Sequence, residues 1–334
     1  MSNVFVIAEA GVNHNGSLSI AKCMVDAAAR AGADAVKFQT FKAGSLVIKN
    51  APKAEYQQKT SRAAETQFEM IRKLELNEAA HYALKEHCLK KNILFMSSPF
   101  DIDGIRLLQK IGVPAYKIPS GEITNLPYLR ALGGLRKKII LSTGMSTMPE
   151  IRKALSILTG AGTKPDSITL LHCTSEYPAP ASEANLKAMH TLKKAFRVNV
   201  GYSDHTEGIE VALAAAALGA TVIEKHFSLD TTMPGPDHKA SIGPAELCSM
   251  VKAIRNIEAA LGDGIKRVSG SELKNRAIVR KSIVAARDIE KGERLSEQNL
   301  AVKRPGSGIS PMFWDSAIGK KASKNFKKDE MISL

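Results

Sequence analysis

The stretch 4–16, VFVIAEAGVNHNG, is a short apolar run that ends in a polar turn containing glycine. Short, continuous apolar runs bounded by such turns are typical of buried strands. After the turn, Leu18, Ala21 and Val25 recur at the spacing of one helical face. Ser17 precedes this segment as a candidate N-cap. This part of the chain therefore predicts one strand followed by one helix.

Seven more apolar runs end in polar residues, and the segments between them mostly have helical spacing. The runs are AVKFQTF (35–41), ILFMSSPF (93–100), AYKIPSGE (115–122), KIILSTGM (138–145), ITLLHCTSEYP (168–178), VNVGYSDH (198–205) and TVIEKHF (221–227). Eight strand–helix units predict an α/β fold, the (β/α)8 or TIM barrel, whose active site lies at the carboxyl ends of the strands. The segment 42–65, after the second run, is unusually long, and we expect it to cover or shape that site.

The 334 residues suffice for one barrel and a small second domain. We predict the barrel, as the catalytic domain, over residues 1–265. The polar stretch 266–280, KRVSGSELKNRAIVR, loses the barrel rhythm and is predicted to be a linker. Residues 281–334 contain short apolar runs separated by turns, which predicts a small, mostly β domain. A domain of this size has a marginal core, so we expect it to pack on the barrel or on a partner chain.

Composition limits the classes of partner. The net charge of +14 is compatible with nucleic acid, an anionic substrate or an ordinary solvated surface. Because aromatic residues make up only 5% and do not alternate with basic ones, we expect no nucleic-acid partner. The sequence contains no run of about 18 apolar residues, so we expect no membrane span. The basic start of a signal peptide is missing, and the four cysteines form no CxxC pair, so we predict a cytoplasmic protein with reduced thiols.

Two histidines end neighbouring strands and are the strongest metal candidates. His205 ends the seventh run and His226 lies near the end of the eighth. Imidazoles on adjacent strand ends can bind one divalent ion and leave positions open for a substrate, as a catalytic metal site requires. His14, His172 and His238 are weaker candidates, because they lie in a turn, within a strand and in a loop.

Two lysines and several serines accompany them. Lys37 and Lys117 lie near the ends of the second and fourth runs, as either Schiff-base nucleophiles or phosphate clamps. Hydroxyls at or near the ends of runs three to seven favour the clamp, because together they suit an anion with many oxygens. These residues are Ser98, Ser120, Ser142, Ser175 and Ser203.

The remaining polar groups near the strand ends are carboxyl, amide and phenol side chains. They are Glu9, Gln39, Glu122, Tyr177 and Asp237. The carboxylates suit acid–base catalysis, and all of the groups can bind sugar hydroxyls. The residues alone thus predict a metal-dependent barrel enzyme that acts on a phosphorylated carboxylate and a polyhydroxylated partner.

With these motifs in place, the chain closely resembles the bacterial sialic acid synthase family over its whole length. The matching motifs include AEAGVNHNG, VKFQTF, APKAEYQ, SSPFD, YKIPSGE, LSTGM, EYPAP, GYSDHT, EKHF, GPDHKAS and KRPGSGIS. From about Ser282 the tail resembles the antifreeze-like (SAF) domain that ends these enzymes. The resemblance implies condensation of phosphoenolpyruvate with an N-acylated mannosamine-type sugar, with release of phosphate by C–O cleavage.

The resemblance also implies roles. His205 and His226 would bind Mn2+ or a similar divalent ion such as Mg2+, which polarises the open-chain aldehyde of the sugar, and Glu9 would assist proton transfer. Phosphoenolpyruvate would be held by Lys37, Ser98, Lys117, Ser120, Ser175 and Ser203. The sugar would be contacted by Gln39, Glu122, Tyr177 and Asp237. Two positions depart from the family: Ser98 stands where Thr is usual, and Ser175 where Asn or Thr is usual.

The resemblance further implies a domain-swapped homodimer in which Arg304 reaches the N-acyl group of the sugar in the partner's barrel. The sugar is open between two candidates. N-acetylmannosamine would give N-acetylneuraminate, which we favour slightly, and 2,4-diacetamido-2,4,6-trideoxymannose would give legionaminic acid. A related barrel enzyme that uses an aldose phosphate would need a second phosphate clamp, and no further basic cluster ends the strands.

Overall fold

The computed structural model describes residues 3–54, 57–58 and 65–334. They divide into two compact units, Met1–Gly262 and Asp263–Leu334. Each unit is described by itself below. Over the described residues, no helix has the length and apolar character that a membrane span requires.

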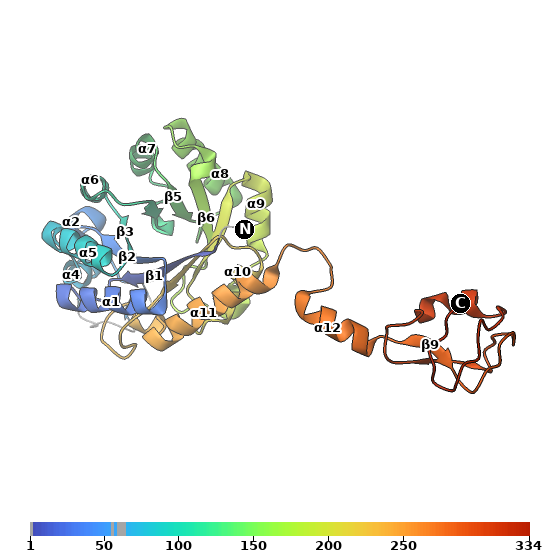
Figure 1. Cartoon of the computed structure of the whole chain (residues 1–334). Coiled ribbons are helices and arrows are strands. Elements are labelled where there is room, and N and C mark those ends of the chain that lie inside the picture. The colour runs from blue at the N-terminus through green and yellow to red at the C-terminus, as the bar shows by residue number, and fades with distance from the viewer. Residues whose placement is uncertain (1–2, 55–56, 59–64) are drawn as a thin grey trace. The chain divides into compact units, whose positions relative to one another are not determined.

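The first unit is an eight-stranded parallel barrel, as predicted (Figure 1). The hydrogen-bonded order is β3-β2-β1-β8-β7-β6-β5-β4, and β3 and β4 lie side by side where the ring closes. The strands are β1 (Phe5–Gly11), β2 (Ala35–Thr40), β3 (Leu94–Pro99), β4 (Tyr116–Ile118), β5 (Ile139–Ser142), β6 (Ile168–His172), β7 (Asn199–Asp204) and β8 (Val222–His226).

Helices surround the strands and bury their apolar faces against them. They are α1 (Leu18–Ala31), α5 (Glu78–Lys90), α6 (Ile102–Ile111), α7 (Leu126–Gly134), α8 (Met148–Gly160), α9 (Ala188–Phe196), α10 (Glu210–Ala217) and α11 (Pro244–Leu261). The first helix begins as the sequence predicts: the Ser17 hydroxyl accepts a hydrogen bond from the Ile20 amide, and Gly32 ends the helix in the left-handed conformation.

In its described part, the long segment after β2 includes the short helices α2 (Ala43–Leu46) and α4 (Gln67–Arg72). A capping box in which Thr66 and Glu69 bond each other's backbone amides begins α4. Of the predicted long loop, residues 55–56 and 59–64 lie outside the described part of the chain.

Alternation along the strands explains why the barrel mouth is polar. Side chains two residues apart on a strand face the same side. The interior apolar cluster comprises Ile7, Ala35, Met96, Ala115, Ile140, Leu171 and Val222. Two residues after these, in the same order, come Glu9, Lys37, Ser98, Lys117, Ser142, Cys173 and Glu224. The apolar layer therefore lies directly beneath a layer of polar side chains.

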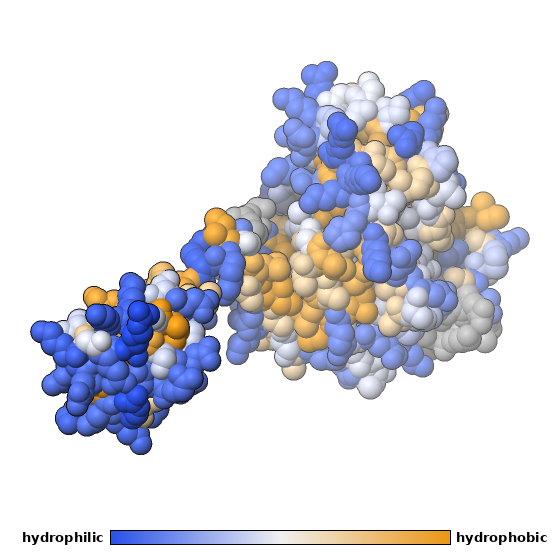
Figure 2. Space-filling model, turned by 90° about the vertical axis from the view of Figure 1, so that its right-hand side faces the viewer, coloured by the Kyte–Doolittle hydropathy of each residue, from blue (hydrophilic) through white to orange (hydrophobic). Residues whose placement is uncertain are grey.

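The second unit holds the predicted linker and the small domain. The predicted linker, 266–280, contains helix α12 (Gly270–Val279), which is N-capped by Ser269. Beyond it, β9 (Ser282–Ala285) and β10 (Leu300–Lys303) pair antiparallel, and α13 (Trp314–Ala317) follows. A small core forms inside, and Figure 2 shows that the visible face of this unit is mostly hydrophilic. Its buried residues include Ile283, Leu295, Leu300, Phe326 and Ile332.

Candidate active site

A cavity of about 470 Å³ opens at the carboxyl ends of the strands, within the range of about 300–1,000 Å³ usual for small-molecule sites. Apart from the three weaker histidine candidates, every candidate site residue that the sequence places in the barrel lines it. These are Glu9, Lys37, Gln39, Ser98, Lys117, Ser120, Glu122, Ser142, Ser175, Tyr177, Ser203, His205, His226 and Asp237. Arg304 belongs to the other unit, after β10.

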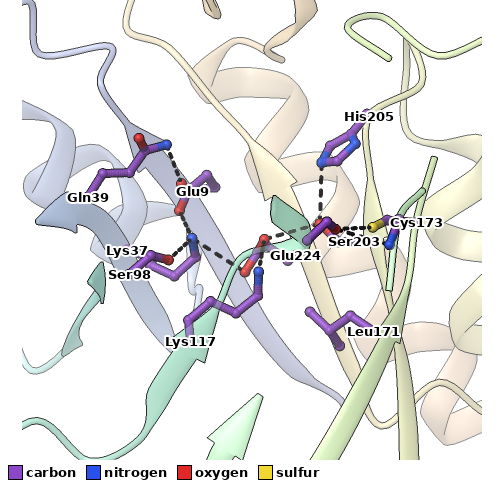
Figure 3. A network of polar contacts seen from close by, with 12 residues as sticks. Glu9, Lys37, Gln39, Ser98, Lys117, Leu171, Cys173, Ser203, His205 and Glu224 are labelled. Carbon is purple, nitrogen blue, oxygen red and sulfur yellow. Dashed lines mark hydrogen bonds and ion pairs between the residues drawn. The ribbon is translucent and has the colours of Figure 1, made fainter. Parts of the chain in front are cut away.

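A network of buried charges forms the floor of the cavity (Figure 3). Lys37 Nζ lies 2.7 Å from Glu9 Oε2 and 3.7 Å from Glu224 Oε2, and it donates a 3.0 Å hydrogen bond to Ser98 Oγ. Lys117 Nζ lies 3.2 Å from Glu224 Oε1. The ionised groups are thus two cations and two anions, all nearly inaccessible to water. An anionic ligand that enters the cavity from solution would approach both ammonium groups.

The two carboxyl groups of the network, Glu9 and Glu224, have widely separated pKa values. Burial raises the pKa of Glu9 to about 7, although Lys37 opposes the shift. Burial also acts on Glu224, but Lys117 and Lys37 outweigh it and hold its pKa at about 2. Two carboxyls with well-separated pKa values are typical of an active site in which one stays ionised and the other exchanges protons near neutral pH. Glu9 therefore has the titration behaviour of a general acid or base.

The two lysines differ as well. Burial lowers the pKa of both, but Glu224 and Glu9 reverse the effect for Lys37, whose pKa is raised. The pKa of Lys117 remains lowered by burial and by the nearby charge of Lys37. The local sequence gives no sign of this, because the burial arises from the barrel. Both lysines keep a carboxylate partner, which favours clamping of an anion over attack by a neutral amine.

Serine hydroxyls and a backbone amide form a cradle beside Lys117. Ser120 Oγ accepts a 3.0 Å hydrogen bond from the Gly144 amide, and Ser142 Oγ is buried without a partner. A Cβ atom on Gly144 would lie 2.2 Å from Ser175 Oγ, so only glycine allows the backbone to come this close. A buried hydroxyl that lacks a protein partner is free to bond an oxygen of a ligand.

The two histidines of the seventh and eighth strands meet above this floor. Their ring centroids are 5.5 Å apart and inclined by 65°, and the Tyr177 ring lies against His205 with centroids 4.2 Å apart and a tilt of 33°. Burial lowers the pKa of His205 to about 4 and, together with the charge of His205, that of His226 well below its usual range. Both imidazoles are therefore neutral at neutral pH, which is the form that binds metal ions.

Hydrogen bonding fits these rings to a metal ion. His205 Nδ1 lies 2.5 Å from the Thr174 carbonyl oxygen, which can only accept, so the proton is on Nδ1 and Nε2 is left as a ligand. His226 Nδ1 is buried with no partner. Two rings bound to one ion through bonds of about 2.1 Å place their centroids roughly 5–6 Å apart. Within the described residues no group of three or more metal-ligating side chains exists, so the pair would leave most positions open.

The three weaker histidine candidates lie outside the cavity lining. His172 Nε2 pairs with the Ala184 carbonyl, His238 Nδ1 with the Ser228 hydroxyl, and His14 Nδ1 accepts from the Gly16 amide. These contacts give each ring a structural role in holding loops at the mouth.

The predicted sugar contacts surround the opening. Gln39 Nε2 approaches Glu9 Oε1 at 3.5 Å, and Glu122 Oε2 accepts a 2.6 Å hydrogen bond from Asn125. Asp237 is buried, which raises its pKa to about 6. These groups supply both donors and acceptors toward the cavity, as a polyhydroxylated ligand requires.

Sequence reasoning missed Glu224, which pairs with both lysines. The signal was present: Glu224 precedes His226 by two residues on one strand, so both face inward. It also missed an ion pair on the outer side of these strands, where Lys225 Nζ lies 2.8 Å from Asp204 Oδ2 with no exposure to solvent. Because these residues adjoin His226 and His205, the pair fixes the strand ends that carry the histidines.

An apolar surface forms another side of the cavity. We call the following six side chains the apolar wall: Val12, Phe41, Leu46, Val47, Met70 and Leu74. They come from the loops after β1 and β2 and from the α4 region.

Comparison with known proteins gives consistent matches. The model of the NeuB family matches residues 24–266, and that of the SAF domain matches residues 280–334. The N,N'-diacetyllegionaminic acid synthase of Campylobacter jejuni is 57% identical over 99% of this chain and 99% of its own length. The synthase of the same name from Legionella pneumophila is 49% identical over 96% of this chain and 91% of its own. The crystal structure of an N-acetylneuraminic acid synthetase from Leptospira borgpetersenii, in complex with citrate, matches with a TM-score of 0.71 and 37% identity, over 82% of this chain and 90% of that one.

Proposed function

Because the chain belongs to the NeuB family, we propose that it condenses phosphoenolpyruvate with 2,4-diacetamido-2,4,6-trideoxymannose and water to give N,N'-diacetyllegionaminic acid and phosphate. The two legionaminic acid synthases at 57% and 49% identity support this sugar over N-acetylmannosamine, which the sequence analysis had slightly favoured. The observation that carries the reaction is a single cavity in which two clamping lysines and a serine cradle face a neutral histidine pair.

Phosphoenolpyruvate would occupy the floor of the cavity. Lys37 and Lys117 would neutralise its phosphate and carboxylate. The hydroxyls of Ser98, Ser142 and Ser175 would donate hydrogen bonds to the phosphate and carboxylate oxygens that the lysines do not bind. The enzyme presents these donors before the substrate arrives, so little reorganisation is needed on binding.

A divalent ion, Mn2+ or Mg2+, would be held by His205 and His226. It would supply an electrophile that polarises the aldehyde of the open-chain sugar. Tyr177, whose ring lies against that of His205, would keep the imidazole in place. Gln39, Glu122 and Asp237 would hold the sugar hydroxyls and so orient the aldehyde toward carbon 3 of phosphoenolpyruvate.

The reaction then balances with the residues present. A bond forms between carbon 3 of phosphoenolpyruvate and the aldehyde carbon, whose oxygen takes up a proton. Glu9, with a pKa of about 7, is the group that would deliver it. Water adds at carbon 2 and gives one proton back to the Glu9 carboxylate. The bond between carbon 2 and the phosphate oxygen then breaks with its electron pair going to phosphate, while the new hydroxyl becomes the ketone and its proton leaves with the phosphate. The anionic Glu224 would hold both lysines in place throughout.

We also propose that the enzyme works in the cytoplasm as a domain-swapped homodimer, with Arg304 of each chain contacting the N-acyl group of the sugar in the other chain's barrel. The limited core of the second unit supports this assignment, because a small domain gains stability from a partner.

Phosphate release tests the proposal. The full chain, loaded with Mn2+, is incubated with phosphoenolpyruvate and either 2,4-diacetamido-2,4,6-trideoxymannose or N-acetylmannosamine. A much higher kcat/KM for the first sugar supports legionaminic acid synthesis, and the reverse order would restore the neuraminate route. Absence of phosphate release with both sugars would refute the proposed reaction.

A further inference from the structure

The apolar wall is not used by any of the steps above, although it faces the same cavity as the charge network. Val12, Phe41 and Leu74 are buried and pack together as a small cluster of their own, with Leu46 against them. Phe41 also meets Phe100 edge to face at 6.0 Å. The wall is thus a surface already packed in the absence of a ligand.

The wall begins beside the histidine pair and extends away from it, because β1 pairs with β8 and β2 follows on the other side of β1. A Cβ atom on Gly11, which precedes Val12, would lie 3.6 Å from His226 Cε1. The remaining wall residues follow β2 or belong to the α4 region, farther around the ring. An aldehyde carbon near the histidines leaves carbon 6 as the carbon of the sugar farthest from them along the chain. The part of the wall after β2 and around α4 is therefore the part available to carbon 6.

Two amides stand beside the wall on the cavity lining. Gln67 Nε2 donates to Gln57 Oε1 at 3.4 Å. An acetamido group carries a donor, an acceptor and a methyl group, and amide side chains next to an apolar surface match that combination.

We propose that the apolar wall is the subsite for the methyl groups of the sugar, and that it selects a 6-deoxy sugar over one with a hydroxyl on carbon 6. The inference rests on the proposed function and names the residues that decide its substrate. A hydroxyl pressed against the wall loses its hydrogen bonds to water, whereas a methyl group gains contact. Rejection of an added hydroxyl by an apolar pocket amounts to about 100-fold at most.

Three sugars separate the contributions of carbon 6 and carbon 4: N-acetylmannosamine, 2-acetamido-2,6-dideoxymannose and 2,4-diacetamido-2,4,6-trideoxymannose. The wild-type enzyme should use the second with a kcat/KM about 10- to 100-fold above that of the first. The variants Val12→Thr and Val47→Thr keep the shape of the side chain and add a hydroxyl to the wall. Each should reduce the preference for the second sugar over the first by roughly 3- to 10-fold, without changing the KM of phosphoenolpyruvate.

Ile48→Thr is the matched control, because Ile48 is 77% exposed on the same loop and does not line the cavity. It should leave the preference unchanged. Thermal unfolding checks that each variant folds, and the half-buried Val47 is the safer of the two wall positions. Equal use of the first two sugars by the wild type, or an unchanged preference in both wall variants, would overturn the inference while the proposed reaction stands. Failure of all three sugars to release phosphate would refute the reaction itself.

Discussion

Glu9→Gln tests whether one carboxyl of the charge network exchanges protons near neutral pH. The side chain is 1% exposed, and burial raises its pKa from 4.5 to about 7. This rise corresponds to roughly 3 kcal/mol between the two protonation states. Glutamine has the same shape but cannot titrate, so the variant removes this free-energy difference and leaves the packing.

The sign of the effect on stability follows from linkage. A carboxyl whose pKa is higher in the folded state favours folding in its protonated form. Its contribution is therefore fully present below pH 4.5 and is lost as the pH rises through about 7. Between pH 5 and pH 8, the wild type should lose about 2 kcal/mol of unfolding free energy relative to Glu9→Gln.

Urea unfolding of both proteins at several pH values measures this difference, and the pH profile of kcat/KM measures the catalytic role. The wild-type profile should have a limb with an apparent pKa near 7 that Glu9→Gln lacks, with activity reduced by about 100- to 10,000-fold. Glu207→Gln, at an exposed position, is the control and should behave as the wild type. Parallel pH dependence of unfolding in wild type and Glu9→Gln would refute the argument from burial.

Three further predictions concern the metal, the strand ends and the second unit. His226→Ala should weaken Mn2+ binding, measured by titration, by more than about 100-fold with little change in thermal unfolding, because changes around a ligand alone cost 10- to 100-fold; unchanged affinity would exclude His226 as a ligand. Lys225→Met leaves the buried Asp204 carboxylate without its cationic partner, so urea unfolding should show a loss of about 3–5 kcal/mol, and a loss below about 1 kcal/mol would contradict the ion pair. Arg304→Ala should raise the KM of the sugar by roughly 10- to 100-fold through loss of a charged hydrogen bond, and an equal rise for phosphoenolpyruvate would argue against sugar contact.

The sequence predicted the fold because each strand combines a continuous apolar run with a polar end. Ile7 in the interior apolar layer and the site residue Glu9 lie two positions apart, and the same spacing recurs around the ring. The alternation along each strand thus allowed both the barrel and most of the cavity lining to be predicted. The helix within the predicted linker, α12, was missed because its exposed surface gives no apolar periodicity.

Glu224, by contrast, had the right spacing but no partner in the local sequence. Its role depends on Lys37 and Lys117, which lie on β2 and β4 and approach it only after the barrel closes. The same holds for the pKa values of Glu9 and Lys117, since burial dominates both and is a property of the folded barrel. Long-range burial and pairing cannot be read from residue spacing.

Charge balance connects these observations to substrate binding. With Glu224 ionised, Lys37 and Lys117 leave the floor with one positive charge whenever Glu9 is protonated, and with none when it is not. An anionic substrate is attracted by the first state and repelled by the extra carboxylate in the second. A dianion on the floor would therefore raise the pKa of Glu9 further, because it adds like charge beside a buried carboxyl. The proton that the aldehyde oxygen needs would in this way be brought to Glu9 by the substrate that begins the reaction.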